Sequence, residues 1–132
     1  MVQIPQYRES EKLKQEGTWV HAASADGWSF KIRRIGTTEW LKARKDATRH
    51  LYGLFPQTDI DEDKITAHIL ADEWITDWQS PEFDFTRENA RKLFLNPEYW
   101  NSLNNELVIR AVNFEHYLKE LADDDDKALK KD

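Results

Sequence analysis

Hydrophobic and polar residues alternate in a short segment near the amino terminus. Trp28, Phe30 and Ile32 occupy every second position, with polar side chains between them. A strand places successive side chains on opposite faces, so these three can lie on a core while their neighbours face water. An Asp-Gly pair, which favours a tight turn, precedes the segment, and an aromatic and β-branched run lies before that turn. The pattern predicts a β-hairpin over residues 18–35.

Helical spacing replaces this alternation in the rest of the chain. Apolar residues recur every three or four positions, as on a helix that buries one face. Thr86 is well placed to cap one helix, and an Asn-Pro pair at residues 96–97 separates that helix from the next. The predicted fold class is therefore α+β, mostly α-helical, with an N-terminal β-hairpin packed on a bundle of about four helices. The predicted helices span residues 38–54, 60–79, 87–95 and 98–121.

The two ends of the chain lack this regularity. Residues 1–16 show no repeating apolar period, and residues 123–132 are almost entirely charged. We expect a flexible N-terminal arm over 1–16, a single globular domain over 17–122 and a disordered charged tail over 123–132. A chain of 132 residues is the usual size of one domain.

Composition argues against several classes of function. The chain has no cysteine, which excludes disulfides, thiolate zinc sites and cysteine nucleophiles. No apolar run approaches the roughly 20 residues of a membrane span, and the amino terminus lacks a signal-peptide pattern. No glycine-rich phosphate loop, dinucleotide fingerprint or nucleophile elbow occurs. These features predict a cytoplasmic protein that is not an enzyme and that binds no cofactor, metal or membrane.

Charge is distributed unevenly along the chain. Residues 1–58 carry 10 Lys and Arg against 6 Asp and Glu, a net charge of +4, whereas residues 59–132 carry 9 against 19, a net charge of −10. A protein of net charge −6 is a poor general nucleic-acid binder, because counterion release requires a basic face. The two oppositely charged halves predict salt-sensitive, head-to-tail self-association into a ring or an open spiral.

His68 and Asp72 are the best candidate pair of metal ligands, because a spacing of four places both on one helix face. No third ligand lies nearby in sequence, so a surface or boundary position is the favoured interpretation of His68. The aspartates at 59, 61 and 63 imitate the start of a calcium loop. Lys64 and Leu70 stand where that loop requires Gly and Glu, which excludes calcium.

The remaining candidates are side chains that could contact a protein partner. Three basic residues share one face of the predicted helix 38–54, although an ordinary solvated face is the favoured interpretation. Aromatic residues of the next segments could line a groove, although tryptophans spaced by four are typical of a core. The candidate partner-binding residues are Lys42, Lys45, Arg49, Trp74, Trp78, Phe83, Phe85 and Phe94.

Three consecutive segments, residues 17–40, 66–78 and 84–118, resemble the tail assembly chaperones of long-tailed phages and prophages. The likeness rests on an aromatic β segment, a middle element that ends on paired tryptophans, and the phrase Thr-x-Glu-Asn-Ala-x-x-Leu-Phe. The glycine-bearing loop common after the middle element is absent. The matching positions are Phe30, Ile32, Arg33, Trp74, Trp78, Asn89, Ala90, Leu93, Phe94, Asn113 and Phe114.

The resemblance implies a binding function rather than catalysis. Members of this family bind the tape measure protein in the host cytoplasm, keep it soluble, help to recruit tail tube subunits, and leave before the virion is mature. The implied mode of binding is an amphipathic helix docked in an apolar groove.

Two other functions stay open. An acidic inhibitor that mimics DNA would use the carboxylates of residues 59–77 and 120–126, although the basic half of the chain argues against it. A small metal-dependent hydrolase would require a third ligand to join His68 and Asp72.

Overall fold

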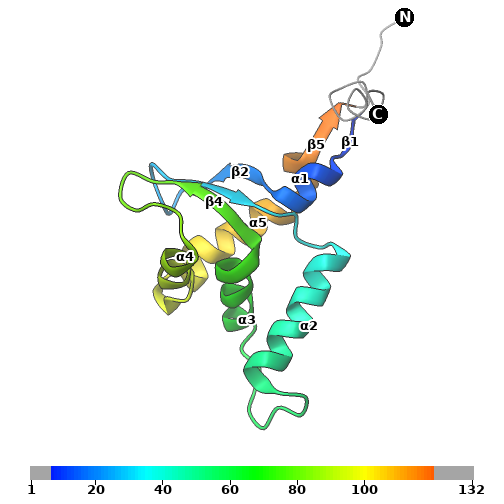
Figure 1. The fold of residues 1–132 in the computed structure, drawn as a ribbon, viewed down its shortest axis with the longest axis vertical. Coiled ribbons are helices and arrows are strands. Elements are labelled where there is room, and N and C mark those ends of the chain that lie inside the picture. The colour runs from blue at the N-terminus through cyan, green and yellow to red at the C-terminus, as the bar shows by residue number, and fades with distance from the viewer. Residues whose placement is uncertain (1–6, 121–132) are drawn as a thin grey trace, which may run out of the picture.

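The computed structural model describes residues 7–120 of the chain, and in this part it is an α+β fold made mostly of helices (Figure 1). The coarse fold prediction is thus confirmed. The elements in chain order are β1 (Tyr7–Glu9), α1 (Glu11–Glu16), β2 (Thr18–His21), β3 (Ser29–Ile32), α2 (Thr38–Tyr52), α3 (Glu62–Ile69), the π-helix η1 (Leu70–Trp74), β4 (Ile75–Gln79), α4 (Arg87–Phe94), the 3-10 turn η2 (Pro97–Tyr99), the π-helix η3 (Trp100–Asn104), α5 (Asn105–Val112), the 3-10 turn η4 (Phe114–Tyr117) and β5 (Leu118–Glu120).

The central sheet has three antiparallel strands in the order β2-β3-β4. β2 and β3 pair as neighbours, and β4 pairs with the other edge of β3, so Phe30 lies opposite Trp78. The prediction of one helix over 60–79 is wrong at its end, because helical structure stops at Trp74 and residues 75–79 form a strand. The spacing of the two tryptophans fits a helix locally. The hairpin of β2 and β3 leaves the backbone groups on the other edge of β3 without partners, and residues 75–79 supply those partners by forming a strand.

Side-chain caps fix where three of the helices begin. Thr37 accepts a hydrogen bond from the Trp40 amide at 3.2 Å, and Thr86 accepts one from the Asn89 amide at 3.0 Å. Asp61 caps α3 by accepting from two amides of its first turn. Each cap satisfies amides that the helix itself leaves without partners. These starts lie close to the boundaries predicted from sequence.

The prediction of one long helix over 98–121 is wrong. The chain instead runs through η2 and η3 into α5, which ends at Val112. Asn113 is extended and caps the next short turn, and Tyr117 is buried there and donates a hydrogen bond to the Ile32 carbonyl at 2.8 Å. Burial of this tyrosine and pairing of β5 with β1 favour a break over continued helix. Residue 121 lies outside the described residues.

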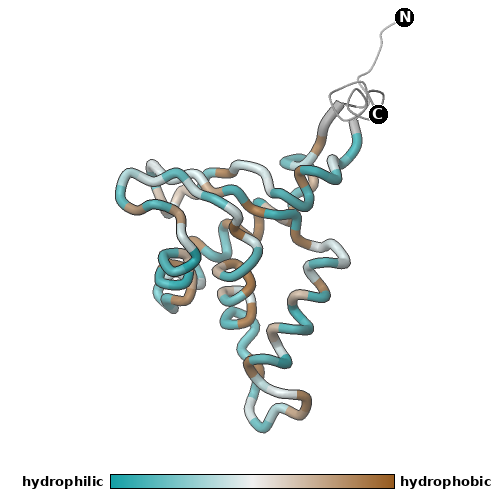
Figure 2. The backbone as a smooth tube through the Cα atoms, in the orientation of Figure 1, coloured by the Kyte–Doolittle hydropathy of each residue, from teal (hydrophilic) through white to brown (hydrophobic). Residues whose placement is uncertain are grey.

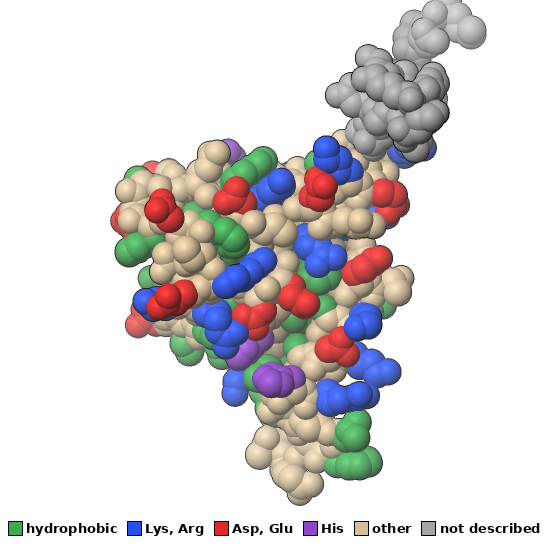
Figure 3. Space-filling view, viewed as in Figure 1, with side chains coloured by type: hydrophobic (Ala, Val, Ile, Leu, Met, Phe, Trp, Pro, Cys, Tyr) green, Lys and Arg blue, Asp and Glu red, His purple; other side chains and the backbone are tan. Residues whose placement is uncertain are grey.

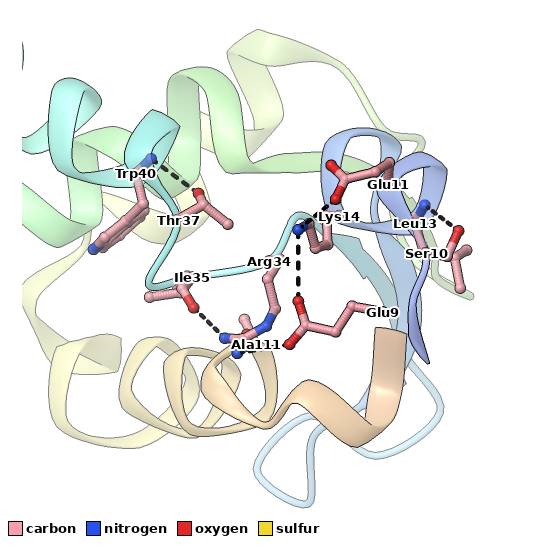
Figure 4. Close-up of polar contacts among 10 residues, drawn as sticks. All are labelled: Glu9, Ser10, Glu11, Leu13, Lys14, Arg34, Ile35, Thr37, Trp40 and Ala111. Atoms are coloured by element: carbon pink, nitrogen blue, oxygen red, sulfur yellow. Dashed lines mark hydrogen bonds and ion pairs between the residues drawn. The ribbon is translucent and has the colours of Figure 1, made fainter. Parts of the chain in front are cut away.

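The amino-terminal segment is tied to the body by a polar cluster (Figure 4). Arg34, on the link between β3 and α2, donates to the Ala111 carbonyl at 3.2 Å and pairs with Glu9 at 3.3 Å. Glu9 also lies 3.7 Å from the Lys14 ammonium group. Residues 7–16, which fall in the predicted flexible arm, thus form a strand and a short helix. The rest of that arm and the predicted tail 123–132 lie outside the described residues.

The core lies between the sheet and the helices. Phe30 packs on Phe94 of α4, with ring centroids 6.0 Å apart, and Trp78 packs on Phe85 at 5.1 Å. On the side nearer α2, Trp40 meets Trp74 edge to face at 5.1 Å. Beyond this contact α2 runs alongside α3, and the loop that joins the two helices lies at the far end of the molecule (Figure 1). No helix in residues 7–120 has the length and apolar character needed to cross a membrane.

Candidate functional site

A surface groove of about 450 Å³ lies between α2 on one side and α3 with η1 on the other. We call it the α2–α3 groove. Figure 3 views this side of the molecule and shows acidic, basic and histidine side chains gathered over these helices. The floor is formed by Ala43, Ala47, Leu51, Ile69 and Trp74, and the rims by Arg33, Glu39, Lys42, Asp46, His50, His68, Asp72 and Glu73.

Small residues on α2 create the groove. Trp40 fills the space between α2 and the body, and Ala43 lies buried one turn later. Ala47 then occupies the position where a larger side chain would reach α3. The two helices come together again at the far end of α2, where Leu51 and Tyr52 pack against the core cluster and the Tyr52 hydroxyl accepts a hydrogen bond from the Asp61 amide at 3.1 Å. The result is an apolar strip bounded by helices on both sides.

Trp74 makes the upper floor rigid. The side chain is only 2% exposed, and its indole nitrogen donates to the Arg34 carbonyl at 3.2 Å. The Arg33 guanidinium carbon lies 4.0 Å from the centre of the Trp74 ring, a cation–π contact. The Arg33 Nε atom is buried without a hydrogen-bond partner, and no ion pair to this side chain forms in the described part of the chain. Arg33 is therefore held at the groove by its stacking on Trp74.

The rims are acidic on balance, with two basic and four acidic side chains. Lys42 pairs with Asp46 at 2.9 Å, and their hydrogen bond raises the pKa of Lys42 and lowers that of Asp46. This pair is fully exposed, so it adds little to stability. Within residues 7–120, Glu39 and Glu73 make no hydrogen bond or ion pair through their side chains. Two carboxylates on opposite rims can therefore meet cationic side chains of a bound segment.

His68 lies half-buried on the α3 wall, in the boundary position favoured from its sequence. Burial lowers its pKa, an effect that the nearby Asp72 opposes and the cationic Arg91 and Lys64 reinforce, so His68 is neutral at pH 7. Asp72 forms an ion pair with Arg91. The described residues contain no cluster of three or more side chains able to hold a metal ion.

The predicted basic residues and Trp74 fall in different places. Trp74 lies in the groove floor, and Lys42 lies on its rim. Lys45 and Arg49 are exposed on α2 but do not line the groove. The basic face thus divides between the groove rim and the outer surface of α2.

The predicted aromatic residues lie around a different site. Trp78 and Phe94 are 5% and 0% exposed, so both belong chiefly to the core, and Phe85 is half-buried against them. Phe83 is 58% exposed and borders a second hollow of about 280 Å³. We call this hollow the aromatic pocket. Its lining residues are Trp28, Trp78, Glu82, Phe83, Asn89, Lys92, Leu93, Asn96 and Tyr99.

Sequence reasoning missed the α3 wall of the groove and the role of the two alanines. Ala43 and Ala47 share the apolar face of the predicted helix 38–54, but their spacing alone does not indicate a groove. A helix whose apolar face narrows to alanine over two turns cannot fill the space beside a neighbouring helix. That feature is the available signal for a groove.

Comparison of this chain with models of protein families, with curated proteins and with solved structures found no match. The assignment of a function therefore rests on the residue pattern and on the geometry of the α2–α3 groove.

Proposed function

We propose that this protein is a tail assembly chaperone of a long-tailed phage or prophage. It would bind the tape measure protein in the host cytoplasm and help to recruit tail tube subunits before the tail is complete. The observation that carries the proposal is the α2–α3 groove, an apolar strip with helical walls and charged rims. The resemblance of residues 17–121 to this family supports the choice of client.

The groove suits an amphipathic helix. α2 has 15 residues, which corresponds to a wall about 22 Å long at 1.5 Å per residue. A client helix lying along such a wall can direct one apolar stripe at the floor while its polar flanks face the rims. Glu39 and Glu73 then face the flanks of the client, and Arg33 can donate to its carboxylates or carbonyl oxygens.

Such a complex is expected to be reversible. Each apolar client side chain buried on the floor contributes roughly 1.5–3 kcal/mol. Association and ordering of the client cost roughly 4–15 kcal/mol, so a few anchors leave only a moderate net affinity. A chaperone that must release its client during tail assembly requires this balance.

The test is co-expression with the tape measure protein encoded in the same phage genome. Wild-type protein should keep the client soluble and co-purify with it. Ala47→Glu places a charged chain on the groove floor and should abolish capture. Leu41→Glu, at a position 64% exposed on the outer face of the same helix, is the matched control and should retain it. Circular dichroism checks that both variants fold. Full capture by Ala47→Glu, or no capture by wild type, would contradict the proposal.

A further inference from the structure

The small side chains in the floor of the α2–α3 groove leave room for large side chains of a bound segment. Ala43 and Ala47 lie one turn apart on α2, and Ile69 of α3 lines the same floor. Figure 2 shows hydrophobic positions interspersed among hydrophilic ones along both helices. Client side chains over the two alanines must be large to fill this space, because small ones would leave a void and lose van der Waals contacts.

Two carboxylates flank the upper end of the floor, the end at which Trp40 meets Trp74. Glu39 precedes Trp40 on α2 and Glu73 precedes Trp74 on η1, and the two tryptophan rings have their centroids 5.1 Å apart. Both glutamates are exposed and line the groove from different helices. Neither side chain forms a hydrogen bond or ion pair within residues 7–120. Each is therefore available to a cation on a different flank of a bound segment.

The other rim carboxylates already have partners within the protein. Asp46 pairs with Lys42 at 2.9 Å, and Asp72 pairs with Arg91 of α4. Arg33 is the remaining charge at the upper end, where it stacks on the floor tryptophan with its Nε atom buried. Two free carboxylates against one guanidinium leave an excess of one negative charge, with the carboxylates on the rims and the guanidinium in the floor.

Other nearby cations lie away from this end of the groove. Lys64 lies over the Tyr52 ring, 5.8 Å from its centroid, near the loop that joins α2 to α3. Lys45 and Arg49 are exposed on α2 but do not line the groove. The negative excess beside the two tryptophans is therefore not cancelled by these three side chains.

The charge of Glu73 already acts on a cation of the opposite rim. The pKa of Lys42 is raised chiefly by its hydrogen bond and charge interaction with Asp46, and in addition by the charge of Glu73. A lysine or arginine of a segment lying between the rims would experience the same attraction, whereas a carboxylate there would be repelled.

We infer that the client of this groove is an amphipathic helix with large apolar side chains along its stripe and lysine or arginine on both flanks of that stripe. The apolar side chains fill the space over Ala43 and Ala47, and the basic flanks lie beside Glu39 and Glu73. A helix with acidic flanks is rejected, because like charges would then meet at both rims. This client class rests on the proposed function, since it takes the groove as the client site.

Fluorescence anisotropy with labelled model peptides tests the selectivity. Two peptides share one leucine stripe at helical spacing and differ only in their flanks, which are lysine in one and glutamate in the other. At about 0.05 M salt, wild-type protein should bind the lysine peptide about tenfold more tightly, and about 1 M salt should remove most of this preference. A third peptide, with lysine flanks and alanine in place of leucine, should bind at least about tenfold more weakly than the first. Equal affinities for the first two peptides, or binding of neither, would overturn the inference.

Charge reversal separates the groove from the net charge of the protein. Glu39→Lys combined with Glu73→Lys should reverse the preference, and the milder pair of glutamine substitutions at the same sites should abolish it. Glu98→Lys combined with Glu115→Lys is the matched control, because both sites are exposed outside the groove and the net charge changes by the same amount. Circular dichroism checks that all variants fold. Equal changes of preference in the two lysine variants would show that net charge alone selects the peptide, which contradicts the inference.

Capture of the tape measure protein distinguishes this inference from the proposed function. If wild-type protein captures the tape measure protein but does not discriminate between the peptides, the inference fails and the proposed function stands. If wild-type protein discriminates between the peptides but does not capture the tape measure protein, the proposed function fails and the selectivity of the groove stands.

Discussion

Replacement of Trp74 by alanine tests whether the floor of the groove is also a major part of the core. The side chain is 2% exposed, contacts Trp40 edge to face, stacks under Arg33 and donates a hydrogen bond to the Arg34 carbonyl. A buried aromatic side chain covers about 150–250 Å², which at about 25 cal/mol per Å² is an upper bound of about 4–6 kcal/mol. The unfolded chain already buries part of this surface, so the true transfer loss is smaller, and the cavity left behind adds to it; measured tryptophan-to-alanine losses lie near 3–5 kcal/mol, and we expect a loss in this range.

The assay is urea denaturation followed by far-ultraviolet circular dichroism, because fluorescence would change with the tryptophan itself. For a slope of roughly 2 kcal/mol per molar, the midpoint should fall by about 2 M. Trp74→Phe should fall less, since it keeps an aromatic ring in the cavity. Trp19→Ala is the control, because Trp19 is 42% exposed and should cost about 1 kcal/mol or less. A Trp74→Ala midpoint as high as that of the control would refute the assignment of Trp74 to the core.

Three further predictions concern local features. Gly17→Ala should lower the free energy of unfolding by about 2–4 kcal/mol, because φ is +102° and a Cβ would lie 3.0 Å from the Ile32 carbonyl carbon. Gly53→Ala is the control, because a Cβ there meets open space, and it should cost only about 1 kcal/mol in the same denaturation assay. Tyr117→Phe should cost about 1 kcal/mol by losing one buried hydrogen bond, and an unchanged melting temperature would contradict this. Burial lowers the pKa of His68 below its ordinary value, so the unfolded chain binds a proton more readily than the folded protein, and the free energy of unfolding should fall as the pH drops below about 6.5. His68→Gln should flatten that decline. A pH profile identical to that of wild type would exclude a contribution of His68 to the pH dependence.

Local signals predicted the starts of several helices well. Thr86 was identified as a cap from the sequence, and its side chain accepts the expected hydrogen bond from Asn89. Phe30 and Ile32, expected on the buried face of a strand, are both fully buried. These features depend on interactions within a few residues, so the order of the side chains along the chain is sufficient to indicate them.

The candidate sites were less visible, because each depends on segments distant in sequence. The α2–α3 groove is lined by residues of α2 on one side and of α3 and η1 on the other, so it depends on how these helices pack. The aromatic pocket joins Trp28 to Phe83 and Tyr99 from later elements. Sequence reasoning named Trp74, Phe83 and Lys42, but it did not divide them between two surfaces.

The sequence by itself determined the α+β class, the Thr86 cap and the buried face of the strand that carries Phe30 and Ile32. The tertiary structure decided the backbone conformation of residues 75–79 and of the segment after Val112. The helical spacing of apolar residues continues through both segments, but neither continues the α-helix that the spacing predicts. In both places a partner distant in sequence supplies hydrogen bonds that a local helix could not. Ile75–Gln79 pairs with the free edge of β3. The segment that carries Tyr117 bonds to the Ile32 carbonyl and pairs with strand β1. A local pattern states which side chains prefer burial, whereas long-range pairing decides which backbone conformation buries them.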